Sequence, residues 1–323
     1  MRTATPLFTT VALLALSSAL GACSATSTDP GSTSSPVTSG TSPETGGSSG
    51  VFKPSPASTG TVQIGAIDPN LGVGNVKTDC QPKLIGIVRD FNSKYSTVNP
   101  HPDFEQFVGP GITPGLVKST LGANGAPEYA DPQPPGDVQI TSKASFDLWY
   151  STAHPANAKV ELDLDNPPAS ASITKSVDQV TGATTYESTS FFPIDGKGTQ
   201  AQDVQWGENK DESKSDQEPK AILPPFHNYH FTFELNTKFI YKPGQVFSFF
   251  GDDDLWVFID RKLAVDVGGL HPQAFGMVEL DKLGLMPDKE YELSVFHAER
   301  RTTTSNFKAT TNITFSNCDP IVR

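Results

Sequence analysis

The stretch that decides the fold is Val246-Phe247-Ser248-Phe249-Phe250-Gly251-Asp252-Asp253-Asp254-Leu255-Trp256-Val257-Phe258-Ile259-Asp260. Aromatic and β-branched residues on both sides of three consecutive carboxylates predict a strand, an acidic turn and a second strand. Aspartate is common in turns, but three adjacent carboxylates repel one another unless a cation or strong donors neutralise them. The triplet therefore predicts a cation site. The alternative is that the three side chains only cap turns and bond backbone amides.

The β pattern continues through the rest of the chain, which contains 27 glycines and 27 prolines among its 323 residues. Short apolar or alternating runs predict strands at residues 83–91, 159–164, 184–192, 231–235, 263–267, 278–280, 291–296 and 307–315. Residues 138–140 and 146–150 are predicted as strand or pre-strand segments, and residues 116–121 as a short helix. Many short strands separated by turns predict an all-β fold, an antiparallel, jelly-roll-like β-sandwich with long loops and little helix.

The formal net charge of −12 argues against nucleic acid as a partner, because phosphate binding requires basic patches that the sequence lacks. Cations and neutral sugars remain compatible with this acidic composition.

The N-terminus predicts export. Arg2 precedes an apolar run at residues 6–20 that is too short to span a bilayer. The following Leu20-Gly21-Ala22-Cys23 resembles a bacterial lipobox, which implies a signal peptide at residues 1–22 and lipid on Cys23. Acyl chains would anchor the protein to the membrane, at the bacterial outer membrane or cell surface, without a transmembrane helix. The alternative is an ordinary secretory signal with a coincidental cysteine.

A tether and one domain are predicted beyond Cys23. Between residues 24 and 60, 29 of 37 residues are Ser, Thr, Gly or Pro, so residues 23–79 are predicted to be a flexible tether and residues 80–323 the folded domain. In an oxidising compartment Cys80 and Cys318 are expected to form a disulfide. The alternative is two unpaired thiols.

Several ordered motifs resemble the fibro-slime domain over about residues 83–317. They are Arg89-Asp90-Phe91, His101-Pro102-Asp103-Phe104, Trp149-Tyr150, Phe191-Phe192-Pro193-Ile194-Asp195-Gly196, His227-Asn228, Phe231-Thr232, residues 249–260, Asp266-Val267-Gly268-Gly269-Leu270-His271, His297-Ala298-Glu299-Arg300 and Ser305-Asn306-Phe307. That family is similar to the protective-antigen-type β-sandwich of calcium-dependent lectins and adhesins.

The resemblance implies a calcium site. In the lectin members an Asp-Asp pair joined by a cis peptide bond holds calcium, and Asp252 and Asp253 fall where that pair is expected. Asp254 is a third candidate ligand, although it stands where those relatives often carry glycine, and Asn306 is the candidate from a second loop. Carboxylate and carbonyl oxygens are the ligands that calcium prefers. Arg261 departs from the family, which usually has glycine in this hairpin turn.

Four further residues are candidates for ligand binding: His271, Glu299, Trp149 and Tyr150. Each has a structural alternative. The histidine and the glutamate could serve the fold, with Arg300 paired to Glu299 or Asp266, and a tryptophan in a sandwich is more often in the core than stacked on a sugar.

The predicted function is a surface-anchored lipoprotein whose sandwich binds carbohydrate or matrix through calcium in adhesion. The alternative is a structural matrix protein with purely stabilising calcium. A glycoside hydrolase using Glu161, Asp163 or Asp165 is a weaker alternative, because nothing places two of these carboxylates in a cleft. The sequence also lacks the Gly-x-Ser-x-Gly and His-Glu-x-x-His signatures of hydrolases, so no enzyme activity is predicted.

Overall fold

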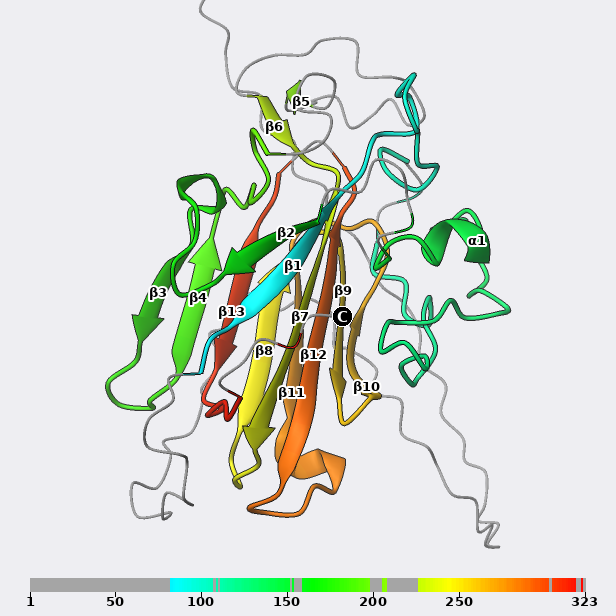
Figure 1. The fold of residues 1–323 in the computed structure, drawn as a ribbon. Coiled ribbons are helices and arrows are strands. Elements are labelled where there is room, and N and C mark those ends of the chain that lie inside the picture. Colours follow the sequence, from blue (N-terminus) through cyan, green and yellow to red (C-terminus); the bar gives the residue numbers. More distant parts are fainter. Residues whose placement is uncertain are drawn as a thin grey trace, which may run out of the picture. The chain divides into compact units, whose positions relative to one another are not determined.

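The computed structural model describes residues 82–106, 109, 111–151, 153, 159–197, 205–207, 226–301, 304–317 and 321. Two antiparallel sheets face one another (Figure 1), which confirms the predicted all-β sandwich. The six-stranded sheet has the order β10-β9-β12-β7-β1-β2, the five-stranded sheet has the order β11-β8-β13-β4-β3, and β5 and β6 form a separate pair. The predicted boundaries at residues 22 and 79 lie outside the described residues.

Most strands follow predicted segments, but those at residues 174–177, 205–207 and 226–228 were not predicted, and the strand at 274–279 overlaps its predicted segment at only two residues. Their bounds are β1 Ile85–Asp90, β2 Lys159–Asp163, β3 Thr174–Val177, β4 Thr184–Ser188, β5 Gln205–Gly207, β6 Phe226–Asn228, β7 Phe231–Ile240, β8 Val246–Gly251, β9 Asp254–Ile259, β10 Lys262–Val267, β11 Ala274–Glu279, β12 Glu290–Glu299 and β13 Phe307–Thr311. The helical elements are α1 Lys143–Phe146 and two 3-10 turns, η1 Ala169–Ala171 and η2 Leu280–Leu283.

The stretch that opens the sequence analysis connects the two sheets. Strand β8 lies in the five-stranded sheet and β9 in the six-stranded sheet, so the acidic residues between them cross from one sheet to the other. Strands β9 and β10 do form a hairpin, and its two turn residues, Asp260 and Arg261, have φ angles of 49° and 64°. Two positive φ angles are those of a type I′ turn, so this turn forms without the family's glycine.

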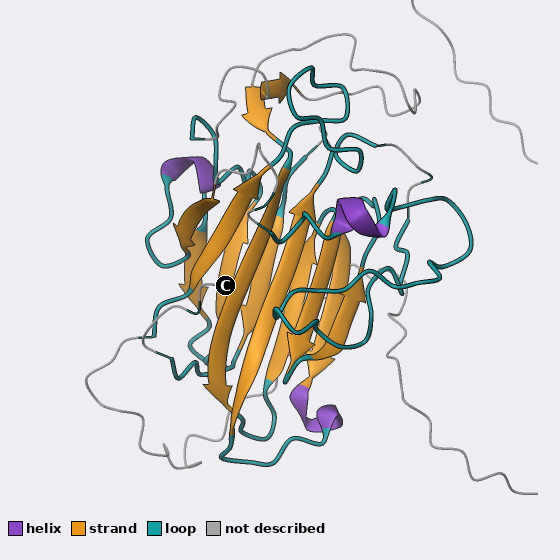
Figure 2. Cartoon of the chain, turned by 45° about the vertical axis from the view of Figure 1, so that its right-hand side comes forward, coloured by secondary structure: helices purple, strands orange, loops and turns teal. Residues whose placement is uncertain are grey.

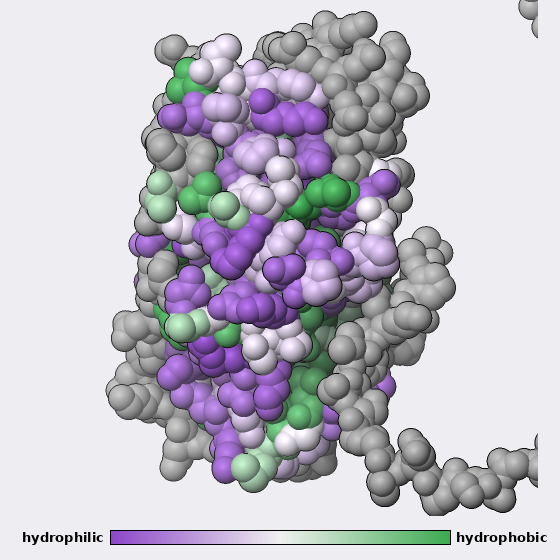
Figure 3. Space-filling view, turned by 90° about the vertical axis from the view of Figure 1, so that its right-hand side faces the viewer, coloured by the Kyte–Doolittle hydropathy of each residue, from purple (hydrophilic) through white to green (hydrophobic). Residues whose placement is uncertain are grey.

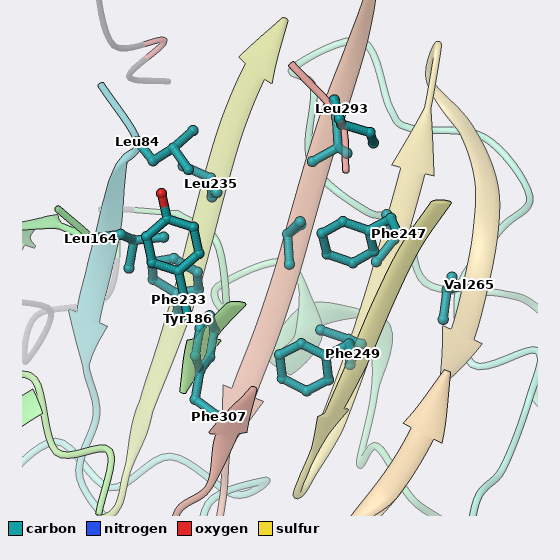
Figure 4. Close-up of a cluster of buried hydrophobic side chains, with 14 of the residues drawn as sticks. Leu84, Leu164, Tyr186, Phe233, Leu235, Phe247, Phe249, Val265, Leu293 and Phe307 are labelled. Carbon is teal, nitrogen blue, oxygen red and sulfur yellow. The ribbon is translucent and has the colours of Figure 1, made fainter. Parts of the chain in front are cut away.

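The central strands of the six-stranded sheet are buried on both faces. All six residues of β9 are buried. Leu255, Val257 and Ile259 pack into the core between the sheets, part of which Figure 4 shows, whereas Trp256 and Phe258 pack into a second core on the outer face. Because successive side chains of a strand point to opposite faces, a strand buried on both sides shows a continuous apolar run instead of alternation.

The second core lies beneath a cover segment, defined here as the described residues from 91 to 151. Figure 2 shows its loops and α1 crossing in front of the six-stranded sheet. The predictions at residues 138–140, 146–150 and 116–121 were wrong, because the cover segment contains α1, turns and isolated bridges. Ser142 caps α1, and Phe146, Trp149 and Tyr150 follow at helical-turn spacing, so their aromatic character reflects burial on the sheet.

The edges of the two sheets approach closely at Gly276 on β11. A Cβ added there would lie 2.5 Å from Val265 Cγ1 and 2.8 Å from Val267 Cγ2, both on β10. Glycine is therefore required for this contact between the sheets.

We predict that Gly276→Ala lowers the free energy of unfolding by about 1–3 kcal/mol, because it overpacks this contact. Adding Val265→Ala removes the nearest atom and is expected to recover part of the loss. The double variant should therefore lose less free energy of unfolding than the two single variants lose together. Urea unfolding of the four proteins measures this. Strictly additive losses would contradict the proposed contact.

Candidate functional site

The acidic loop, residues 251–254, lies at one end of the sandwich, where β12 ends and β13 begins. Gly251 pairs with Phe307 of β13, and Asp254 pairs with Ala298 of β12. The side chains of Asp252, Asp253 and Asp254 are buried, with 5 %, 6 % and 0 % exposure. Burying carboxylates is costly unless they are paired or hydrogen-bonded, so each needs its own partners.

Asp252 joins the acidic loop to the loop that precedes β13. Its Oδ1 accepts from the backbone N–H of Asn306 at 2.7 Å, and its Oδ2 accepts from Asn306 Nδ2 at 2.9 Å and from Thr304 Oγ1 at 2.7 Å. His297 Nε2 donates to the Asp252 carbonyl at 2.7 Å. The structure thus brings together Asp252 and Asn306, which sequence spacing alone could not align.

Asp254 forms a buried ion pair with Arg300. Arg300 Nε donates to Asp254 Oδ2, both side chains are 0 % exposed, and Asp254 Oδ1 accepts from the backbone N–H of Gly269 at 2.6 Å. Both carboxylate oxygens of Asp254 are therefore engaged by protein donors. The pairing of Arg300 with Glu299 or Asp266, considered from the sequence, is wrong, because Asp266 accepts from Trp256 Nε1 at 3.0 Å and from the Gly115 N–H at 2.7 Å instead.

Arg300 also connects the acidic loop to the cover segment. Its Nη1 donates to the carbonyl of Gln139 at 2.9 Å, and its guanidinium lies 4.9 Å from the centroid of the Trp149 ring. Trp149 Nε1 donates in turn to Asp103 Oδ2 at 3.0 Å, while the backbone N–H of Arg300 donates to Asp253 Oδ2 at 3.0 Å. One side chain thus reaches both the acidic loop and the layer outside the sheet.

Carboxyl groups cluster around Asp253. Burial raises its pKa to about 7, the positive charge of Arg300 opposes that rise, and the carboxylates of Asp254 and Asp252 add to it. Burial, followed by the charges of Asp253 and Asp252, raises the pKa of Glu299 well above its ordinary range. Glu299 is 1 % exposed, and its Oε2 has no hydrogen-bond partner among the described residues. This end of the sandwich therefore holds more buried carboxyl groups than Arg300 can neutralise, and the raised pKa values favour their protonated forms.

The chemistry of these donors fits a hard cation such as calcium, which prefers carboxylate and carbonyl oxygens. Asp252, Asp253 and the side-chain oxygen of Asn306 lie where they could serve, whereas Asp254 is committed to Arg300. The match is partial, because no three His, Cys, Asp or Glu side chains of the described residues converge in a metal-binding arrangement. The Asp252–Asp253 peptide bond is trans, not cis as the resemblance implies, since Asp131–Pro132 is the one cis bond in the described part of the chain.

The other predicted ligand-binding residues differ in their surroundings. Trp149 is 0 % exposed and lies in the second core, so its ring cannot stack on a sugar, and the prediction for this residue was wrong. Nδ1 of His271 lies 2.8 Å from the Pro272 carbonyl oxygen, and its Nε2 lies 3.2 Å from the Val267 carbonyl oxygen. Both ring nitrogens therefore have a backbone partner. Tyr150 borders a cavity on the cover segment.

The sequence did not reveal two residues that bond to the acidic loop or to its partner Arg300. Thr304 bonds Asp252, and the Gln139 carbonyl bonds Arg300, the partner of Asp254; both are far from the acidic triplet in the chain. The only sequence signal near Thr304 is Asn306, two residues later. Gln139 contributes its backbone carbonyl, for which no sequence signal exists.

Cys23, Cys80 and Cys318 lie outside the described residues, so the lipid site and the disulfide stay predictions. Within the described part of the chain, no helix has the length and apolar character needed to cross a membrane.

The fold and the acidic loop define an all-β sandwich module with a buried carboxylate cluster at one end. The chain is similar in sequence to three psi proteins of Dictyostelium discoideum: 34% identical to psiR over 220 residues, 34% to psiC over 218 and 35% to psiK over 234. The matches cover 68%, 66% and 70% of this chain but only 20%, 38% and 31% of those relatives. These relatives do not support the bacterial lipoprotein context. No family model matches, so the fibro-slime assignment stays a prediction.

Two solved structures show a weaker likeness. The PA14 sugar-binding domain from an RTX adhesin is matched over 73% of this chain and 96% of that domain, at 9% identity and a TM-score of 0.29. The A domain of epithelial adhesin 9 from Candida glabrata, in complex with Galβ1-4GlcNAc, is matched over 76% of this chain and 84% of that domain, at 11% identity and a TM-score of 0.29. TM-scores this low do not establish a shared fold.

We predict that Arg300→Met lowers the free energy of unfolding by about 3–5 kcal/mol, because it leaves Asp254 buried without a counter-charge. Adding Asp254→Asn removes that charge and should recover part of the loss. Urea unfolding monitored by circular dichroism measures both variants. If Arg300→Met were as stable as the parent protein, the ion pair would not hold this end of the sandwich together.

Proposed function

We propose that the acidic loop binds calcium and that the sandwich is a binding module for carbohydrate or matrix, acting in adhesion and not in catalysis. The observation that supports this is the group of buried carboxyl side chains around Asp253, of which Glu299 Oε2 lacks a hydrogen-bond partner among the described residues. A buried carboxylate that cannot be neutralised by a protein cation either takes up a proton or binds a metal ion.

Asp252, Asp253 and Asn306 would hold the ion, and Asp254 would not, because the buried guanidinium of Arg300 already neutralises its charge. Bound calcium would offer remaining coordination positions to vicinal hydroxyl groups of a sugar. The protein's own contribution is to fix the two loops relative to each other, through the three hydrogen bonds that Asp252 accepts from Asn306 and Thr304.

A second candidate is a structural role, in which calcium only stabilises the end of the sandwich and the partners are proteins of a matrix. Asp252, Asp253 and Asn306 are each at most 9 % exposed. This burial favours the structural role over a site at which a sugar binds to the ion. The experiment below separates the two.

The proposal also includes export and a lipid anchor on Cys23, at the outer membrane or cell surface. This part of the proposal rests on the sequence alone. The Ser- and Gly-rich residues 23–79 would then hold the sandwich away from the membrane. Metabolic labelling with a palmitate analogue tests the anchor, and absence of label from the intact exported chain would contradict it.

We predict that calcium at 100 times its dissociation constant stabilises the protein by about 2.7 kcal/mol, and that Asp253→Asn removes most of this effect. Asp253 is chosen because Asn keeps a carbonyl oxygen for the Arg300 N–H, whereas changing Asp252 would also separate the two loops. Asp260→Asn is the matched control, since Asp260 is exposed at the far end of β9. Thermal melting in calcium and in chelator measures the effect.

Glycan-array binding of the same three proteins decides between the two candidates. Glycan signals that disappear in chelator and in Asp253→Asn support the binding module. A calcium-dependent melting shift without any glycan signal supports the structural role. No melting shift in the parent protein would overturn the calcium site.

We predict that calcium affinity increases with pH between about 6 and 8, since a pKa of about 7 means that Asp253 must lose a proton to bind the ion. Without calcium, the stability of the folded state changes with pH in the opposite direction. A raised carboxyl pKa stabilises the folded state at low pH, and this contribution is lost as the pH rises through 7. Calorimetric titration in two buffers of different ionisation enthalpy measures the released proton. A pH-independent affinity would contradict this assignment.

A further inference from the structure

A cavity of about 420 Å³ opens on the cover segment, separate in sequence from the acidic loop. Two stretches line it, residues 123–128 and residues 143–150, the second of which contains α1. Figure 3 shows this side of the molecule, where hydrophilic residues predominate and hydrophobic patches are small. Its volume falls within the range of roughly 300–1,000 Å³ that is usual for small-ligand sites.

The cavity combines an aromatic part with a polar rim. Phe146 and Tyr150 form the aromatic part, with their rings in an edge-to-face arrangement 6.4 Å apart, and little of either ring is exposed. The rim carries Glu128, Lys143 and Asp147, all more than two-fifths exposed, together with Asn124. This mixture places hydrogen-bond donors and acceptors around a small apolar surface.

Each rim group has bonding capacity left within the described structure. Glu128 uses Oε2 to bond Lys118, and Asp147 uses Oδ2 to bond Lys143. Asn124 accepts through Oδ1 from the Ala126 N–H at 3.1 Å. The second oxygens of both carboxylates and the amide N–H groups of Asn124 have no described protein partner. They can therefore bond a ligand that both donates and accepts.

The charges of the rim cancel. Glu128 is neutralised by Lys118, with 2.8 Å between the charged atoms, and Asp147 by Lys143, four residues earlier on the same turn of helix. An anionic or cationic ligand would gain little from two balanced pairs. A neutral ligand with several hydroxyl groups matches this rim, and its C–H groups match the aromatic edges.

The cavity walls are held by bonds to the six-stranded sheet. The Arg261 guanidinium donates to the carbonyls of Gly122 and Leu121, and the Leu121 N–H donates back to the Arg261 carbonyl at 3.0 Å. On the other wall, Ser142 and Ser145 form a reciprocal capping box that fixes the start of α1. A preformed site loses less conformational entropy on binding than a flexible one.

We propose that this cavity is a second, calcium-independent binding site for one or two rings of a neutral saccharide. It shares no residue with the acidic loop. The edge of Tyr150, which is 8 % exposed, contacts the apolar part of a sugar above the buried Phe146, and Glu128, Asp147 and Asn124 bond its hydroxyl groups. The proposal goes beyond the calcium-dependent function and does not require it.

The test uses saturation-transfer difference NMR of the intact folded chain in chelator, with galactose, mannose, N-acetylglucosamine and lactose as neutral probes and glucosamine and sialic acid as charged ones. We expect at least one neutral probe to bind with a dissociation constant on the order of 1 mM. Asp253→Asn should bind equally well, because it affects only the acidic loop.

Two variants address the cavity itself. Ala123→Trp places a large side chain at an exposed lining position, and Asp147→Ala removes a rim acceptor at an exposed site, so both should fold. Ala169→Trp, at an exposed position outside the cavity, is the matched control for the first. Binding should weaken at least roughly tenfold in Ala123→Trp, which corresponds to about 1.4 kcal/mol, and be unchanged in the control.

Three outcomes would overturn the proposal. They are no neutral probe binding in chelator, binding of charged probes alone, and equal binding by Ala123→Trp and the parent protein. None of them bears on the calcium site, whose failure would appear as an absent melting shift.

Discussion

This end of the sandwich depends on Arg300, whose guanidinium is buried. It pairs with Asp254 at the start of β9, its backbone N–H bonds Asp253, and its Nη1 bonds a carbonyl of the cover segment. A buried ion pair gains little over a well-packed apolar pair, because both charges must be desolvated. Its contribution is therefore geometric: one side chain fixes the start of β9 relative to the cover segment.

The three adjacent aspartates consequently have three different roles. Asp254 is neutralised, Asp252 binds the neighbouring loop through Asn306 and Thr304, and Asp253 retains an elevated pKa. Of the two sequence interpretations, the one in which carboxylates bond local donors is correct for Asp252 and Asp254, and the cation site stays a prediction. Asp252 and Asp254 bond protein donors, so the electrostatic case for a cation depends on Asp253 and on Glu299, whose backbone lies on another strand.

The sequence predicted the strands well because their apolar runs are long enough to identify without a partner. Strands β7 to β10, β12 and β13 fall on predicted segments except for the exact ends, whereas β11 overlaps its predicted segment only at Val278 and Glu279. Prediction failed in the cover segment, where Phe146, Trp149 and Tyr150 suggested a strand although they form a turn of helix and its continuation. Their apolar character comes from packing on the sheet, which local sequence does not reveal. The partner of Arg300 was missed for the same reason, because strand order decides which acid it meets.

The strand order also explains why the polar side chains that could bind a ligand lie at the edges of this fold. The central strands of the six-stranded sheet are buried on both faces, so their side chains serve two cores and leave little surface for a ligand. Binding groups must then come from loops at the strand ends or from the layer that covers the sheet. The acidic loop is of the first kind and gains its electrostatic character from burial. The cavity beside α1 is of the second kind, and its charged groups stay exposed and paired. The two environments favour different chemistry: a desolvated carboxylate excess attracts a cation, whereas balanced, hydrated pairs favour neutral hydroxyl groups.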